Sequence, residues 1–121
     1  MGRVIATIPV SPRRGDVWFG DLDPIVGHEQ ESLRPLLVIS DDRFNAGSSR
    51  RCVIVPITRT DKNLRIHVRV APPEGSLREP SVILCDQPRS ISHDRLDHRQ
   101  GRVSPQTMAA VEDRLRRLLD L

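Results

Sequence analysis

Short apolar runs separated by polar loops dominate the chain from Arg13 onward. Two runs, at residues 35–40 and 52–58, are almost continuously apolar, as strands buried on both faces are. A third, at 66–70, alternates apolar and basic positions and predicts a strand with one buried and one basic face. Further short strands are expected at 16–22, 81–84 and 101–103. Pro56 lies inside its run, so we expect that strand at a sheet edge or with a bulge.

The pattern changes to a helical period near the C-terminus. Ser104 is a good N-cap residue, and Pro105 suits the first helical position. Apolar residues then recur on one helical face. They are Met108, Val111, Leu115, Leu118 and Leu119. The sequence therefore predicts a mainly β protein, a small barrel of five to seven short strands with a C-terminal helix. Residues 1–12 are expected to be an N-terminal extension, and 13–121 a single domain.

Composition narrows the choice of function. A chain of 121 residues fits one domain. Only three residues are aromatic, which argues against nucleic-acid binding through rows of stacked rings. The net charge of +3 permits an anionic partner without requiring one. Of the basic residues all but Lys62 are arginine, which suits phosphate binding but is equally explained by codon bias.

The cysteines and the lengths of the apolar runs indicate the cellular compartment of the protein. Cys52 and Cys85 lie on separate apolar runs and suggest small buried side chains in a reducing compartment. No apolar run approaches the ~20 residues of a membrane span. The N-terminal apolar stretch is too short for a signal peptide. We therefore expect a cytoplasmic protein.

The loop before the run at 35–40 is the first candidate for chemistry. It gathers His28, Glu29, Gln30 and Arg34. A base that takes a proton from a hydroxyl and a fixed cation for developing charge are the parts that phosphodiester cleavage needs. Arg34 precedes Pro35, so it is expected to be extended and firmly held. The alternative is a solvated loop in which Arg34 pairs with a glutamate.

Three other segments are weaker candidates. Asp86 follows an apolar run, where partial shielding can turn a carboxylate into a base, but it is equally able to cap a turn or pair with Arg89. Thr58 ends a strand and offers a hydroxyl to a phosphate, although such a threonine is more often structural. Basic positions on one strand face can follow a phosphate backbone or protect a sheet edge. They are Arg65, His67 and Arg69.

His93 and His98 are expected in loops. No H-x-x-x-H or C-x-x-C pattern supports a metal site, and no cofactor is expected.

Taken in order, these segments resemble the MazF/PemK/Kid family of toxin–antitoxin endoribonucleases over about residues 13–119. Four stretches carry the resemblance. They are Arg14-Gly15-Asp16-Val17-Trp18 with Asp21-Leu22-Asp23-Pro24; Gly27-His28-Glu29-Gln30 with Arg34-Pro35; Val53-Ile54-Val55-Pro56-Ile57-Thr58; and Cys85-Asp86-Gln87-Pro88-Arg89-Ser90-Ile91. The last is similar to the PemK/Kid branch.

The resemblance implies an SH3-like barrel, a homodimer, and a cognate antitoxin that covers the RNA groove. It implies sequence-specific, metal-independent cleavage of single-stranded RNA, which inhibits translation. The 2′-hydroxyl would attack the adjacent phosphate and give a 2′,3′-cyclic phosphate and a 5′-hydroxyl.

The resemblance also implies roles for individual residues. Arg34 would stabilise the phosphorane charge, and Thr58 would lie near the scissile phosphate. Asp86 would be the base and His28 would orient it, with Glu29 as the alternative base. RNA-binding positions are expected at Gln30, Arg65, His67, Arg69, Gln87 and Arg89. The PemK/Kid branch has an arginine, a proposed acid, where this chain has Leu84. This leaves the general acid unassigned, because an arginine such as Arg34 is a poor proton donor.

Two other functions fit the same fold. A gyrase poison like CcdB relies on an aromatic near the end of the C-terminal helix, and this chain has none there. A non-catalytic nucleic-acid-binding barrel would explain the basic positions but gives no reason for the grouping of His28, Glu29, Arg34 and Asp86.

Overall fold

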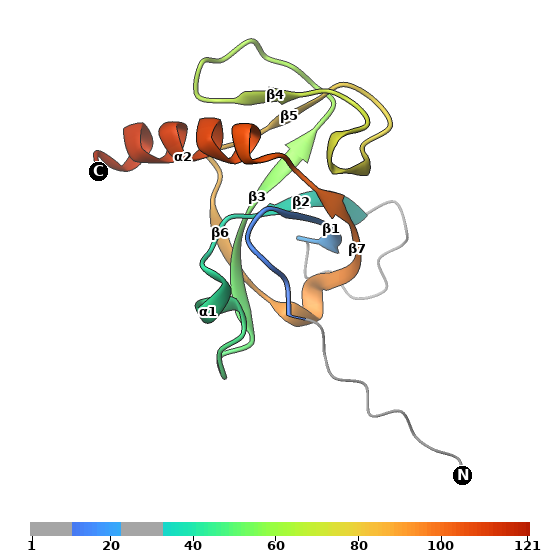
Figure 1. The fold of residues 1–121 in the computed structure, drawn as a ribbon, viewed down its shortest axis with the longest axis vertical. Helices are drawn as coiled ribbons and strands as arrows, with labels where there is room; N and C mark the ends of the chain where they lie inside the picture. Colours follow the sequence, from blue (N-terminus) through green and yellow to red (C-terminus); the bar gives the residue numbers. More distant parts are fainter. Residues whose placement is uncertain (1–10, 23–32) are drawn as a thin grey trace.

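The computed structural model describes residues 11–22 and 33–121 (Figure 1). The predicted extension at residues 1–12 lies almost entirely outside this part of the chain. The strands are β1 (Asp16–Asp21), β2 (Leu33–Val38), β3 (Arg51–Thr58), β4 (Val68–Val70), β5 (Ser81–Ile83), β6 (Arg89–Ser92) and β7 (Leu96–Arg102). The helices are α1 (Asp42–Asn45) and α2 (Pro105–Leu119), with 3-10 turns η2 (Glu74–Ser76) and η3 (His93–Arg95).

All seven strands belong to one antiparallel sheet. Its hydrogen-bonded order is β4-β5-β3-β2-β1-β7, and β6 pairs with β3. Strand β1 pairs with β2 on one side and with β7 on the other, so the first and last strands in the sequence are neighbours in the sheet. The predicted mainly β fold with a C-terminal helix is confirmed. Within the described residues the sheet path does not close on itself, so the fold lacks a closed barrel.

The core lies on both faces of the central strands. Leu37 belongs to the cluster that packs against α2, whereas Leu36 and Val38 belong to a second cluster on the opposite face. Successive side chains of a strand point to opposite faces. A strand buried on both faces therefore needs a continuous apolar run, which explains why β2 and β3 were recognised from the sequence.

Pro56 lies in the centre of the sheet, so the edge predicted for its strand is wrong. β3 pairs with β2 along one side, and with β6 and then β5 along the other. The paired registers of β6 and β5 reach Ile54 and Ile57 respectively, so Pro56 lies between them. Its carbonyl still accepts from the Leu84 N–H at 2.9 Å. The missing N–H of proline falls where β3 changes partner and a ladder bond is not required.

Helix α2 begins as predicted. The Ser104 hydroxyl accepts from the Thr107 N–H at 3.1 Å, and Pro105 is the first helical residue. Val111 is fully buried, and Met108 and Leu115 pack on the same core cluster. Leu118 and Leu119, predicted on this apolar face, are exposed because the helix extends beyond the sheet (Figure 1). No helix in the described ranges is long and apolar enough to cross a membrane.

The region after β5 differs most from the prediction. A strand was expected at 101–103, but β7 starts at Leu96, and β6 was not predicted. His98, expected in a loop, lies within β7 and pairs in register with Phe19 of β1. Short α1 lies in a segment predicted as a loop. Residues of β6 and β7 are mostly polar and exposed, so their strand conformation comes from pairing with β3 and β1 rather than from a hydrophobic pattern.

Candidate functional site

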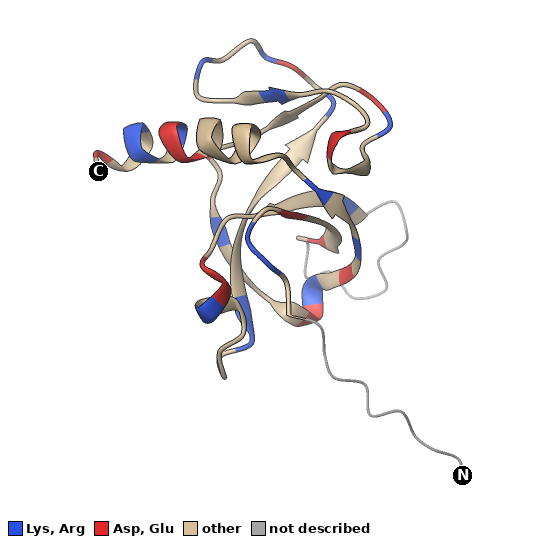
Figure 2. Ribbon diagram, viewed as in Figure 1, with Lys and Arg blue, Asp and Glu red and all other residues tan. Residues whose placement is uncertain are grey.

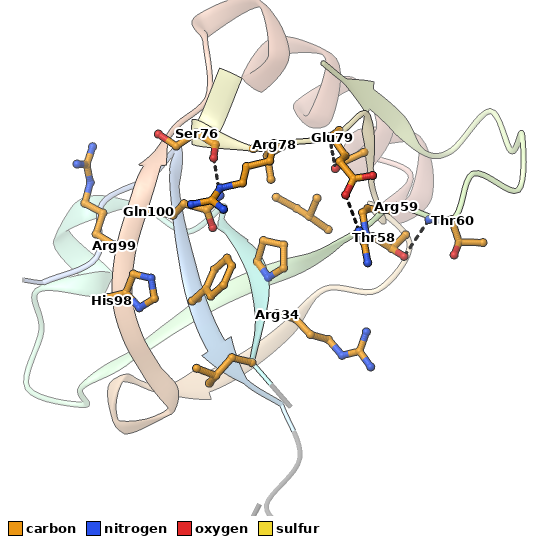
Figure 3. Close-up of a pocket in the computed structure, with 16 residues that line it drawn as sticks. Arg34, Thr58, Arg59, Thr60, Ser76, Arg78, Glu79, His98, Arg99 and Gln100 are labelled. Atoms are coloured by element: carbon orange, nitrogen blue, oxygen red, sulfur yellow. Dashed lines mark hydrogen bonds and ion pairs between the residues drawn. The ribbon is translucent and has the colours of Figure 1, made fainter. Parts of the chain in front are cut away.

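A groove of about 930 Å³ crosses one face of the sheet (Figure 3). Strands β1, β2, β3 and β7 contribute to it, together with residues 76–81, which follow or overlap η2 and reach the start of β5. The groove therefore combines five segments that are separated in the sequence. Its lining residues are Phe19, Leu33, Arg34, Pro35, Ile57, Thr58, Arg59, Thr60, Ser76, Leu77, Arg78, Glu79, Ser81, His98, Arg99 and Gln100.

Two predicted site residues meet in this groove. Arg34 is the second residue of β2, where its neighbour Pro35 is also in strand conformation, as expected from the sequence. Thr58 is the last residue of β3. Figure 3 shows both side chains on the same side of the groove. The Thr58 Oγ1 accepts from the Thr60 N–H at 3.2 Å, which leaves the hydroxyl hydrogen able to donate to a ligand.

The groove is rich in guanidinium groups. Besides Arg34, it is lined by Arg59, Arg78 and Arg99, which the sequence analysis did not select. Arg59 forms an ion pair with Glu79 at 2.6 Å (Figure 3). Such a surface attracts anionic ligands, and planar guanidiniums suit phosphate oxygens.

Arg99 is held from behind by a buried carboxylate. Asp16, whose side chain is 2% exposed, accepts from Arg99 Nε at 3.1 Å and from Arg102 at 2.9 Å. The same carboxylate accepts from the Arg13 N–H at 2.9 Å and from the Trp18 indole at 3.3 Å. Four donors satisfy the buried charge, so Asp16 fixes the position of Arg99 at the groove.

Asp86 is not among the residues that line this groove. It follows β5, and its Oδ1 accepts a hydrogen bond from His67 Nε2 at 2.9 Å. Because an ionised carboxylate can only accept, Nε2 carries the proton of the imidazole. The His67 side chain is 4% exposed and that of Asp86 is 35% exposed. The structure thus joins Asp86 to His67, whereas Arg34 and Thr58 line the groove.

His67 is buried, so the basic face predicted for residues 65–70 is not continuous. Its backbone N–H donates to the Leu64 carbonyl at 3.1 Å in a turn, and β4 begins only at Val68. The alternation of buried and exposed side chains that is typical of a strand therefore starts at Val68. The His67 side chain precedes it and is buried. Arg69 is exposed on β4 and donates to Asp61 at 2.6 Å and to Asn63 at 2.7 Å. The bond from Arg69, together with one from the Asn63 backbone N–H at 2.7 Å, holds the pKa of Asp61 below its ordinary value.

A second hollow of about 640 Å³ lies between β4, the loop before it and α2. Arg65, His67 and Arg69 line it together with Arg114 and Arg117 of the helix. The Arg65 carbonyl accepts from Arg114 Nε at 2.7 Å, which ties the loop to α2. Predicted RNA-binding residues from 65 to 69 thus gather at this hollow rather than at the groove that holds Arg34.

The remaining predicted site residues are distributed as follows. Gln87 is exposed in a turn, where its N–H donates to the Leu84 carbonyl at 3.0 Å, and Arg89 is the exposed first residue of β6. His28, Glu29 and Gln30 lie outside the described residues. Within the described part of the chain, no group of three or more His, Cys, Asp or Glu side chains is arranged to hold a metal ion.

Comparisons with known proteins agree with this architecture. Residues 13–119 match the family model of PemK-like, MazF-like toxins of type II toxin–antitoxin systems. The chain is 36% identical over 104 residues to endoribonuclease EndoA of Bacillus subtilis, an alignment that covers 85% of this chain and 90% of EndoA. It is also 36% identical over 108 residues to endoribonuclease PemK of Escherichia coli, covering 88% and 80% of the two chains.

Solved structures show the same fold. MazF from Deinococcus radiodurans superimposes with a TM-score of 0.77 at 26% identity, covering 93% of this chain and 99% of that one. An endoribonuclease in complex with its cognate antitoxin, from a mycobacterial species, gives a TM-score of 0.76 at 26% identity, with 92% and 97% covered. The chain belongs to the PemK-like, MazF-like family of type II toxin–antitoxin toxins.

Proposed function

We propose that this chain is a sequence-specific endoribonuclease that cleaves single-stranded RNA without a metal ion and thereby inhibits translation. The observation that carries the proposal is the placement of Arg34 and Thr58 in one groove lined by further guanidiniums. The relatives that share most of the chain are named endoribonucleases, which supports the same reaction class.

In the proposed reaction the RNA supplies its own nucleophile. The 2′-hydroxyl oxygen attacks the adjacent phosphorus while a base takes its proton. The bond to the 5′-oxygen then breaks, and that oxygen receives a proton, which leaves a 2′,3′-cyclic phosphate and a 5′-hydroxyl. Arg34 stabilises the negative charge that develops on the phosphorane, and Thr58 donates a hydrogen bond to a phosphate oxygen. Both groups stand on strands, where they are held in place.

The base in our proposal is Asp86, with Glu29 as the alternative and His28 as an orienting group. The hydrogen bond from His67 to Asp86 Oδ1 holds the carboxylate in one orientation, and within the described residues its Oδ2 accepts no hydrogen bond. Asp86 does not line the groove of a single chain, so Glu29 is kept as the alternative base and is tested beside it. Gln30, Gln87 and Arg89 are proposed to contact RNA, and Arg65, His67 and Arg69 to extend the contact surface toward α2.

We further propose that the chain acts as a cytoplasmic homodimer whose groove is covered by a cognate antitoxin. A structural neighbour was solved in complex with its own antitoxin, which supports this partner class. An acidic segment would complement the guanidiniums of the groove. Sedimentation of the free chain at micromolar concentration tests the dimer, and a folded monomer would contradict it.

The two rival functions predict different behaviour. A gyrase poison would leave RNA intact. A non-catalytic binding protein would bind RNA with an affinity that falls with salt, and would not cut it. The match to relatives named as endoribonucleases favours neither rival.

The decisive experiment is incubation of the antitoxin-free protein with a long unstructured RNA in excess EDTA, followed by mapping of the cut ends. We expect discrete cuts with 2′,3′-cyclic phosphate ends. Arg34→Ala should lower the cleavage rate roughly 10²–10³-fold and RNA affinity much less. Arg43→Ala is the matched control, since Arg43 is exposed and pairs with Asp41 beside α1, away from the groove. Intact RNA with the wild-type chain would overturn the proposal.

A further inference from the structure

One wall of the groove carries two rings side by side. Phe19 of β1 and His98 of β7 are paired in register, with ring centroids 5.0 Å apart and ring planes inclined at 45°. On the other side of β1, Phe19 is paired with Pro35 of β2. Histidine, phenylalanine and proline therefore form one row across three neighbouring strands. All three line the groove.

This row is left open to solvent, unlike the core beside it. Val17 lies two residues before Phe19, on the same face of β1, and is fully buried in the cluster that packs against α2. Phe19 belongs to neither core cluster and is only half-buried. The His98 side chain is 55% exposed. Figure 3 shows the His98 ring extending from β7 into the groove. An aromatic ring exposed in the wall of a groove is suited to a flat ligand that can stack on it.

The imidazole has a hydrogen-bond partner beside the groove. His98 Nδ1 donates to the Asp97 carboxylate at 2.7 Å, which favours the tautomer protonated at Nδ1. Arg99 follows in the chain, is positioned by Asp16, and lines the same groove. Arg34 is paired across the strands with Gly20, the residue after Phe19. The two rings are thus flanked by a guanidinium on each neighbouring strand.

We infer that Phe19 and His98 form the binding subsite for one unpaired nucleobase, which stacks on the rings while its flanking phosphates lie against Arg34 and Arg99. This inference rests on the proposed function, because it assigns a position in the RNA to that groove. Every base has a π-face, so stacking holds a nucleotide in place without reading its identity. A single subsite is consistent with a chain that has only three aromatic residues.

The test uses a short single-stranded RNA that contains the mapped cleavage site, with a 2′-O-methyl group at the cleaved nucleotide so that it binds without reacting. The base is removed at one position at a time, and the dissociation constant is measured for each abasic RNA. For the wild-type chain we expect one position at which base removal weakens binding roughly 5- to 50-fold. In His98→Ala the intact RNA should bind more weakly, and base removal at that position should cost little more.

Three variants complete the experiment. Phe19→Leu keeps an apolar side chain but removes the ring, and it should behave like His98→Ala. His98→Phe restores a ring and should restore the penalty for base removal. His93→Ala is the matched control: His93 contacts the Arg51 carbonyl near β6 and does not line the groove, so its abasic profile should equal that of the wild type. Thermal unfolding of each variant checks that it is folded, and exposed His98 keeps the test valid where Phe19→Leu does not fold.

The outcomes separate the two proposals. A wild-type chain that cleaves RNA but gives the same abasic profile as His98→Ala overturns the stacking subsite and leaves the proposed function standing. A wild-type chain that neither cleaves nor binds RNA overturns both. Loss of the single-position penalty in the His98 and Phe19 variants, with its return in His98→Phe, establishes the subsite.

Discussion

At the scale of single residues, the hydrogen bond between His67 and Asp86 is the feature that bears most on mechanism. It occupies one oxygen of the carboxylate that we propose as the base, and the buried imidazole fixes the orientation of the other. Asparagine has the same shape as aspartate and its amide oxygen can accept the same bond from His67. The Asp86→Asn variant therefore removes the charge and leaves the contact.

We expect Asp86→Asn to lower the cleavage rate roughly 10²–10⁴-fold, because the variant cannot take up a proton. Glu29→Gln should have a much smaller effect. Single-turnover cleavage rates and the affinity for non-cleavable RNA, measured for both variants, separate catalysis from binding. The reverse order of effects would assign the base to Glu29 and leave Asp86 as a structural partner of His67.

The two cysteines give a pH-dependent prediction. Burial raises the pKa of Cys52 and of Cys85 to about 11, from a reference value of 9.0. Between these values the unfolded chain loses thiol protons that the folded chain keeps. The free energy of unfolding should therefore be unaffected by these groups below pH 9 and fall as the pH rises above it. Urea unfolding between pH 7 and pH 10.5 measures this slope.

The Cys52→Ala and Cys85→Ala variants are the controls, since each should reduce that slope. Alkylation gives a second readout, because only about 10⁻³ of each folded thiol is ionised at pH 8. Rapid modification of either cysteine in the native protein would show that its thiol is accessible and would contradict the burial argument.

At the scale of elements, the attachment of α2 depends on how the helix begins. The Ser104 hydroxyl satisfies the N–H of Thr107, and the Ser104 N–H donates to Glu74 Oε2 at 2.8 Å. We expect Ser104→Ala to destabilise the protein by about 1 kcal/mol through loss of the cap. The midpoint of urea unfolding measures the change. Ser49→Ala, at an exposed turn position, should leave the midpoint unchanged, and an equal shift in both variants would show that the cap is not the cause.

Elements with a strong local pattern were predictable, and those created by pairing were not. β2 and β3 read as strands because both of their faces are buried, and α2 because its cap and its buried face coincide. β6 and most of β7 carry polar, exposed side chains, and they are strands only because β3 and β1 supply their hydrogen-bond partners. The prediction that His67 lies on an exposed basic face was wrong for a related reason. Residues 64–67 form a turn and β4 begins only at Val68, so the two-residue alternation of a strand does not apply to His67.

The same distinction applies to the groove. Arg34 and Thr58 were predictable because each adjoins a buried strand that the sequence marks clearly. Phe19, His98 and Arg99 were missed because they meet through the pairing of β1 with β7, two strands far apart in the sequence. The available signal for Phe19 was that it is one of the few aromatic residues of the chain and lies in a predicted strand.

At the scale of the whole molecule, charge is mixed rather than segregated. Basic and acidic residues are both scattered over the loops, the outer strands and the second half of α2, and neither kind gathers on one side (Figure 2). The net charge is only +3. A general electrostatic attraction to RNA is therefore weak, and the groove guanidiniums must supply most of it.

This leads to a prediction about salt. Four guanidiniums line the groove, those of Arg34, Arg59, Arg78 and Arg99, and one of them pairs with Glu79. The logarithm of the affinity for non-cleavable single-stranded RNA should fall against the logarithm of salt concentration with a slope of about −2 to −3. Arg78→Ala should make this slope shallower by about 0.7, whereas Arg43→Ala should not change it. A slope near zero, or equal slopes in both variants, would place the RNA elsewhere.

The position of β1 between β2 and β7 also sets when the groove comes into existence. Phe19 is among the first described residues to be synthesised and His98 among the last, yet the two rings face each other across adjacent strands. A ribosome makes about 5–20 residues per second, and domains fold as their segments emerge. A growing chain therefore has no complete groove until β7 has left the exit tunnel. Any activity that depends on this groove therefore begins only after β7 has emerged and has paired with β1.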